Sequence, residues 1–181
     1  MKKILSVILV CAFAVGVMTG CNQVSRLDID NPVTSDILNT SGEYAARGYV
    51  EAIYNDDEAM FAACFPDGFY DKLKQTSGDD IFGQYKQAMA YDGTFLGTAF
   101  KAAQDYTTEG GYSEDDMRDS ISLLMDIPAE DITAMQMEAI EIFFGDGEKN
   151  VSQTVYFLVF EYSGSWYMYN VQNSDSDFSN R

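Results

Sequence analysis

The chain has 181 residues, of which 29 are acidic and 11 are basic, giving a formal net charge of −18. Binding to nucleic acid or to an anionic lipid surface depends on Lys and Arg, so this charge argues against both functions. The sequence also contains no histidine, which excludes Ser-His-Asp triads, HExxH zinc sites and histidine acid–base catalysis. We expect no cofactor and no metal site.

Residues 1–20 have the layout of a secretion signal. Two lysines precede an apolar run over residues 4–17, within the ~7–15 residues of a signal core and shorter than the ~20 that span a bilayer. The run ends in Val17-Met18-Thr19-Gly20-Cys21. This ending resembles a bacterial lipobox, in which cleavage after Gly20 leaves an acylated Cys21 as the N-terminus. A short transmembrane anchor and an ordinary cleaved signal are the alternatives.

Cleavage at this point predicts a lipid-anchored protein at the extracytoplasmic face of a cell membrane. The mature chain keeps nine basic and 29 acidic residues. Cys64 then has no cysteine partner for an intrachain disulfide, and its apolar surroundings favour a small buried hydrophobe over a nucleophile. Residues 21–40 are polar and lack a periodic apolar pattern, so we expect a flexible tether.

Helical spacing dominates the next part of the chain. Ser41 is the expected N-cap of a first helix that ends near Tyr54, and Asn55 or Asp56 is the expected cap of the second. Pro66 ends the second helix. The predicted helices cover residues 41–54, 57–65, 67–75 and 79–90.

The period then changes from helical to alternating. Residues 94–106 predict a first strand, and Ser113 with Asp116 predicts a capped helix that ends near residue 126. Three strand-like runs follow, separated by glycine-containing turns, at residues 132–144, 151–162 and 165–172. Helices on one face of an antiparallel sheet that ends in a three-strand meander mean an α+β domain over residues 41–172. The tail, 173–181, is predicted to be disordered.

Two segments at either end of this domain resemble one protein family. They are Tyr49-Val50-Glu51-Ala52-Ile53-Tyr54-Asn55-Asp56-Asp57 and Phe160-Glu161-Tyr162-Ser163-Gly164-Ser165-Trp166-Tyr167-Met168. Both resemble small lipoproteins of Gram-positive gut bacteria that carry an NTF2-like (cystatin-like) domain. The resemblance implies a cone, in which helices pack on a curved four-stranded sheet around a cavity. Family members include ketosteroid isomerases and many non-catalytic binding or dimerising domains, so fold alone does not select a function.

Glu141 is the first candidate site residue. Met135, Met137, Ala139 and Phe143 share one face of its strand, and strict alternation places Glu141 on that apolar face. A desolvated carboxylate in a cavity could act as a general base. A β-bulge or an edge position that turns Glu141 to solvent is the favoured alternative.

Aromatic residues concentrate in the last hairpin and could form a stacking platform for a sugar or peptide. The favoured interpretation is that these aromatic residues pack in the sheet and the core. The possible pocket comprises Glu141, Tyr156, Trp166, Tyr167 and Tyr169. Three pairs of adjacent acids, at 56–57, 79–80 and 115–116, lie where helices begin, so they predict caps rather than calcium ligands.

Three functions remain open. The first is a non-catalytic module, anchored to the membrane through Cys21, that binds an unknown protein or small-molecule ligand at the cell envelope. The second is a ketosteroid-isomerase-like enzyme that uses Glu141 or another cavity carboxylate with a tyrosine hydroxyl. The third is a structural homodimer formed through the outer face of the sheet.

Overall fold

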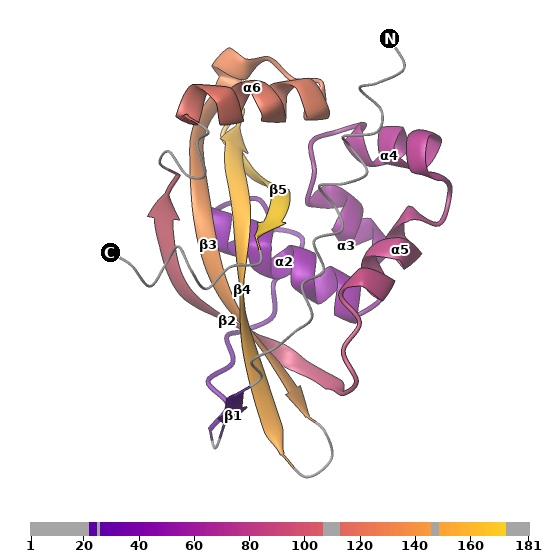
Figure 1. Cartoon of the computed structure of the whole chain (residues 1–181), viewed down its shortest axis with the longest axis vertical. Coiled ribbons are helices and arrows are strands. Elements are labelled where there is room, and N and C mark those ends of the chain that lie inside the picture. The colour runs from indigo at the N-terminus through magenta and orange to yellow at the C-terminus, as the bar shows by residue number, and fades with distance from the viewer. Residues whose placement is uncertain (1–21, 25, 107–112, 146–148, 173–181) are drawn as a thin grey trace.

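The computed structural model describes residues 22–24, 26–106, 113–145 and 149–172. The expected leader, Cys21 and the expected disordered tail lie outside the described residues. After a short strand come four helices, a long strand, a further helix and a three-strand meander (Figure 1). The helices pack on an antiparallel sheet, which confirms the predicted α+β class and is compatible with an NTF2-like fold.

The helices lie close to their predicted positions. In the described part of the chain, none of them is both long enough and apolar enough to cross a membrane. Their bounds are α2 (Gly42–Tyr54), α3 (Glu58–Ala63), α4 (Phe69–Ser77), α5 (Ile81–Ala88) and α6 (Glu114–Met125), with a 3-10 turn η1 (Ala129–Asp131).

Side-chain caps explain most of these helix starts. The Ser41 hydroxyl accepts from the Tyr44 amide, and Ser113 forms the predicted capping box with Asp116. Asp57 caps α3, so the expectation of Asn55 or Asp56 as its cap was wrong. The expectation of a cap from the pair at 79–80 was also wrong, because Asp80, the residue before α5, makes no side-chain capping bond.

Four long strands form an open sheet in the spatial order β2-β3-β4-β5, and all neighbours are antiparallel. The bounds are β2 (Thr94–Asp105), β3 (Ile132–Gly145), β4 (Asn150–Tyr162) and β5 (Ser165–Gln172). The short β1 (Asn22–Val24) pairs with the first residues of β4, on the edge that β5 does not reach. In Figure 1 this end of the sheet is at the bottom and α6 crosses the opposite end.

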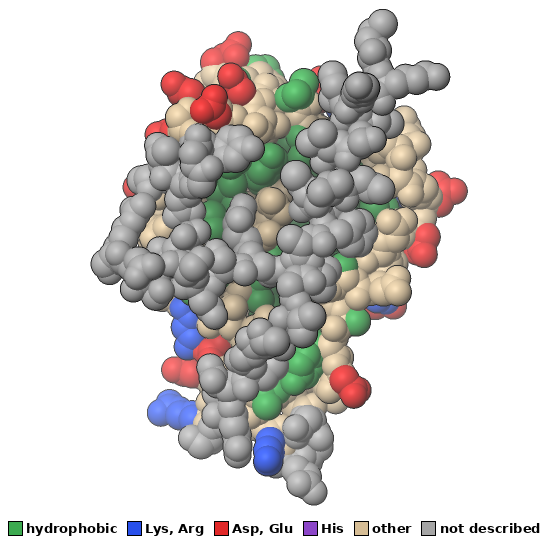
Figure 2. All heavy atoms as spheres, in the orientation of Figure 1, with side chains coloured by type: hydrophobic (Ala, Val, Ile, Leu, Met, Phe, Trp, Pro, Cys, Tyr) green, Lys and Arg blue, Asp and Glu red, His purple; other side chains and the backbone are tan. Residues whose placement is uncertain are grey.

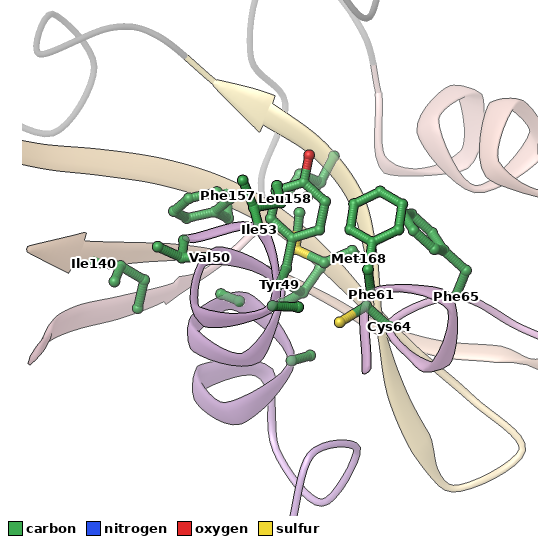
Figure 3. Packing of buried hydrophobic residues seen from close by; sticks show 14 of the residues in the cluster. Tyr49, Val50, Ile53, Phe61, Cys64, Phe65, Ile140, Phe157, Leu158 and Met168 are labelled. Atoms are coloured by element: carbon green, nitrogen blue, oxygen red, sulfur yellow. The ribbon is translucent and has the colours of Figure 1, made fainter. Parts of the chain in front are cut away.

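The hydrophobic core lies between α2 and the sheet. Figure 3 shows Val50 and Tyr49 of α2 beside Ile140 of β3 and Phe157 of β4, and the rings of Tyr49 and Phe157 lie 6.1 Å apart. Most of the β4 segment 155–160 is buried, as expected for a strand in the middle of the sheet. Cys64 is fully buried beside this core, as predicted.

The segment between β1 and α2 is not the free tether that its composition indicated. Val33 and Leu38 are buried in the core. The Asp30 amide donates to the Thr98 carbonyl, which fixes the segment along the free edge of β2. The apolar residues of this stretch follow no regular helical or alternating spacing, so the sequence did not reveal that the segment packs on the domain.

Candidate functional site

Strand β3 places its two glutamates on opposite faces of the sheet. Its pairing with β4 is continuous from Ala134 to Gly145, and a spacing of three residues reverses the side-chain direction. Glu141 therefore keeps the face of Ala139 and Phe143, as strict alternation predicts. The favoured alternative, a bulge or an edge position at Glu141, was wrong because β3 is regular there and lies between β2 and β4.

Glu141 is surrounded by polar partners. The Ser152 hydroxyl donates to its carboxylate at 2.6 Å, and Lys101 of β2 forms an ion pair with it. Its side chain is 14% exposed. A carboxylate held by a cation and a hydroxyl differs from the isolated, desolvated base that the sequence suggested.

Glu138 is the isolated carboxylate of this strand. It is 1% exposed, and its Oε2 atom has no hydrogen-bond partner among the described residues. Burial, and to a lesser extent the nearby charge of Glu43, together raise the pKa of the Glu138 carboxyl to about 7. At neutral pH this group is therefore divided between its protonated and ionised forms.

The start of α2 accommodates Glu138 because residue 42 is a glycine. A Cβ atom at Gly42 would collide with the Glu138 carboxylate and would lie 2.9 Å from Cγ2 of Val159. Ser41 already caps the helix by accepting from the Tyr44 amide. Glu138 therefore lies under the first turn of a helix whose N-terminal end favours negative charge, while burial opposes that charge.

A second set of buried polar side chains joins α2 to β2. Arg47 and Glu51 lie one turn apart on α2 and are both buried. Arg47 donates to the Thr98 hydroxyl at 3.1 Å, and that hydroxyl donates to Glu51 at 2.6 Å. Glu51 also accepts from the Val33 amide at 2.8 Å, and Arg47 donates to the Asn31 carbonyl at 2.5 Å.

The network of Arg47, Glu51 and Thr98 forms a structural clamp between α2 and β2. Arg47 also bonds Glu43 at 3.0 Å and lies 3.8 Å from Asp30. A buried charge is tolerated when opposite charges and hydrogen bonds surround it, and both charged groups here satisfy that condition. The clamp fastens residues 30–33 to the domain.

The aromatic residues of the possible pocket do not gather at one place. Adjacent residues of β5 point to opposite faces, so Trp166 and Tyr167 are separated by the sheet. Tyr167 packs on Phe160, with ring centroids 5.9 Å apart. Tyr156 pairs with Ala139 and so shares the face of Glu141.

Tyr167 is also far from Glu141 along the sheet. Phe160 pairs with Met135, six residues before Glu141 on β3, a separation of about 20 Å along the strand. Tyr169 lies at the register shift between β4 and β5. The structure thus keeps Tyr156 near Glu141 on one face of the sheet and separates Trp166 and Tyr167 from them.

Cys64 is not placed for chemistry. Its thiol lies 3.3 Å from the Met60 carbonyl, to which it donates, and burial raises the pKa of the thiol. No group of three or more metal-binding side chains occurs within the described ranges.

Sequence reasoning missed Glu138 although a usable signal was present. Two glutamates three residues apart on a strand must face opposite sides, and both faces of β3 carry apolar residues.

We compared the chain with protein-family models, with curated proteins and with solved structures, and none matches it.

Proposed function

We propose that the protein is a lipoprotein anchored through Cys21 to the extracytoplasmic face of a cell membrane, with a non-catalytic NTF2-like domain that binds a protein partner or a small ligand at the cell envelope. The observation that carries this proposal is the segment from Val17 to Cys21, which follows two lysines and a short apolar run. Two or more acyl chains on one protein anchor it stably in the membrane.

The contacts of Glu141 and Glu51 argue against either carboxylate acting as a catalytic base, which supports a non-catalytic domain. Lys101 forms an ion pair with Glu141, and the Ser152 hydroxyl donates a hydrogen bond to it. Arg47 forms an ion pair with Glu51. A general base needs a free carboxylate within reach of its substrate, and these two carboxylates are already committed to protein partners. The dispersed aromatic residues likewise favour packing over a single stacking platform.

Metabolic labelling tests the anchor. The full chain is expressed in a bacterial host with radiolabelled palmitate, beside Cys21→Ser and Cys64→Ser as the matched control. The proposal expects label in the wild type and in Cys64→Ser, and none in Cys21→Ser. Label that survives in Cys21→Ser refutes lipidation at this cysteine.

A second candidate function, proton transfer of the ketosteroid-isomerase type, is favoured by one observation. Glu138 is buried, its Oε2 atom lacks a described partner and its pKa is about 7, as a base working at neutral pH requires. Isomerisation of a β,γ-unsaturated ketosteroid, followed by absorbance of the conjugated product, tests it. Turnover by the wild type that Glu138→Gln abolishes supports this candidate, and no turnover by the wild type removes it.

A further inference from the structure

Glu138 is a buried acid without the partners that such a group needs. Most described acids lie at the surface, like the dense group near α6 at the top of Figure 2. Glu51 and Glu138 are the buried ones within the described ranges. Glu51 has the Arg47 cation and the Thr98 hydroxyl as partners, whereas Oε2 of Glu138 has no hydrogen bond from any described residue. An ionised carboxylate is unstable in such a place.

The first turn of α2 lies directly against the Glu138 carboxylate. A Cβ atom at Gly42 would collide with that carboxylate, and it would lie 3.2 Å from Oε1 of Gln136. The Gln136 amide nitrogen donates to Asp105 at 3.0 Å, so its oxygen lies on the side of Gly42. An amide oxygen can accept from a protonated acid but repels an ionised one. The closed first turn therefore suits the protonated form of Glu138.

The acids on this face of the sheet also disfavour a negative charge on Glu138. Glu43 and Tyr44 are the titratable residues in the first turn of α2. The charge of Glu43 raises the pKa of the Glu138 carboxyl, although burial contributes more. Asp105 of β2 and Glu161 of β4 lie on the same face as Glu138, by the register of the strands.

The basic residues of the neighbouring elements are bound to other acids. Arg47, the basic residue of α2, bonds Glu43 at 3.0 Å, and Lys101 of β2 pairs with Glu141 on the opposite face of the sheet. Strands β3 and β4 contain no Lys or Arg. The N-terminal end of α2 favours a negative charge, but burial and Glu43 outweigh it, because the pKa of the Glu138 carboxyl is raised to about 7.

We propose that the first turn of α2, residues 42–45, is a pH-sensitive latch, which is closed on the sheet while Glu138 is protonated and opens when Glu138 ionises. Opening hydrates the carboxylate and frees the amides of Tyr44 and Ala45, which bond the side chain and the carbonyl of Ser41. The later turns stay in place because the clamp and the core hold them. A partner at this end of α2 thus meets a different surface at acidic and at alkaline pH. The latch belongs to the domain and does not depend on lipidation.

The size of the effect follows from the protons bound in the closed and the open state. With the latch open, the hydrated carboxyl has its ordinary pKa of 4.5, and with the latch closed its pKa is about 7. The opening equilibrium therefore rises as pH increases between these two values, and it levels off above them. From pH 5 to pH 8 the open fraction should increase on the order of 50-fold.

Hydrogen exchange of the full-length chain, read at single residues by mass spectrometry, tests the latch. Wild type, Glu138→Gln and the matched control Glu130→Gln are compared at pH 5, 6, 7 and 8, with rates corrected for the effect of pH on free amides. We expect the protection of the Tyr44 and Ala45 amides to fall on the order of 50-fold in wild type and in Glu130→Gln. In Glu138→Gln it should stay constant, and the Ile53 amide near the end of α2 should keep its protection in all three proteins.

Three results overturn the latch. They are protection at Tyr44 and Ala45 that does not change with pH in the wild type, a fall that is equally large in Glu138→Gln, and a fall of the same size at Ile53, which indicates loss of stability in the whole domain. If Glu138→Gln fails to fold, Glu138→Met supplies a second neutral side chain and is expected to keep constant protection.

Discussion

Replacing Glu138 by Gln should make the domain more stable, and more so at higher pH. The pKa of Glu138 is raised from 4.5 to about 7 in the folded state, chiefly by burial. Gln keeps the shape of the protonated acid and removes the ionisable group.

The direction of the pH dependence follows from the number of protons that the folded and the unfolded chain bind. Between the ordinary pKa and about 7, folded Glu138 keeps a proton that the unfolded chain has released, so the wild type loses stability as pH rises through this window. A shift of about 2.5 units at 1.36 kcal/mol each corresponds to about 3 kcal/mol above pH 8. We expect Glu138→Gln to be nearly neutral at pH 4.5 and stabilising by up to about 3 kcal/mol at pH 8.

Urea unfolding of residues 22–181, followed by circular dichroism across pH 4.5–8.5, measures this difference. The start at Asn22 keeps β1 and omits the lipidated cysteine. Acids that do not interact with Glu138 contribute equally to both proteins, so the difference between wild type and variant isolates Glu138 together with its repulsion from Glu43. Glu130→Gln, at an exposed residue of η1, controls for loss of one negative charge. A Glu138→Gln variant that is less stable than the wild type at pH 8, or whose difference is the same at all pH values, would refute the reasoning.

Three further predictions concern the buried residues. Gly42→Ala should destabilise the domain by about 1–3 kcal/mol in urea, because the new methyl group meets the Glu138 carboxylate; an increase in stability from helix propensity alone would contradict this. Arg47→Met should cost about 3–5 kcal/mol because it leaves Glu51 buried without its cation, and replacing both residues by Met should restore much of the loss in the same assay. The Cys64 thiol should react with a thiol reagent at the rate of global unfolding, because it is buried and its pKa is raised; rapid reaction in native conditions would count against this burial.

The sequence predicted the elements of the fold well because their signals are local. Ser41 and Ser113 mark helix starts through hydrogen bonds within their own first turn. Glycine-containing turns separate the last three strands, and the apolar segment 155–160 shows that β4 is central.

The candidate site was harder to predict because it depends on contacts distant in sequence. Glu138 is isolated because Gly42, almost a hundred residues earlier, allows α2 to approach it. Glu141 is engaged because Lys101 lies on the neighbouring strand. The segment before α2 packs on the domain through Asp30 and the clamp around Arg47, and such pairings leave no periodic pattern in the chain.

The central claim is that Cys21 is a lipidated N-terminus, and intact-peptide mass spectrometry tests it most directly. The full chain is expressed in a bacterial host, extracted from membranes with detergent and digested. The account predicts an N-terminal peptide that begins at Cys21 and carries the mass of a diacylglyceryl group, and its absence from Cys21→Ser. A membrane-bound wild-type protein whose N-terminal peptide begins before Cys21, or begins at Cys21 without the lipid mass, would contradict the account.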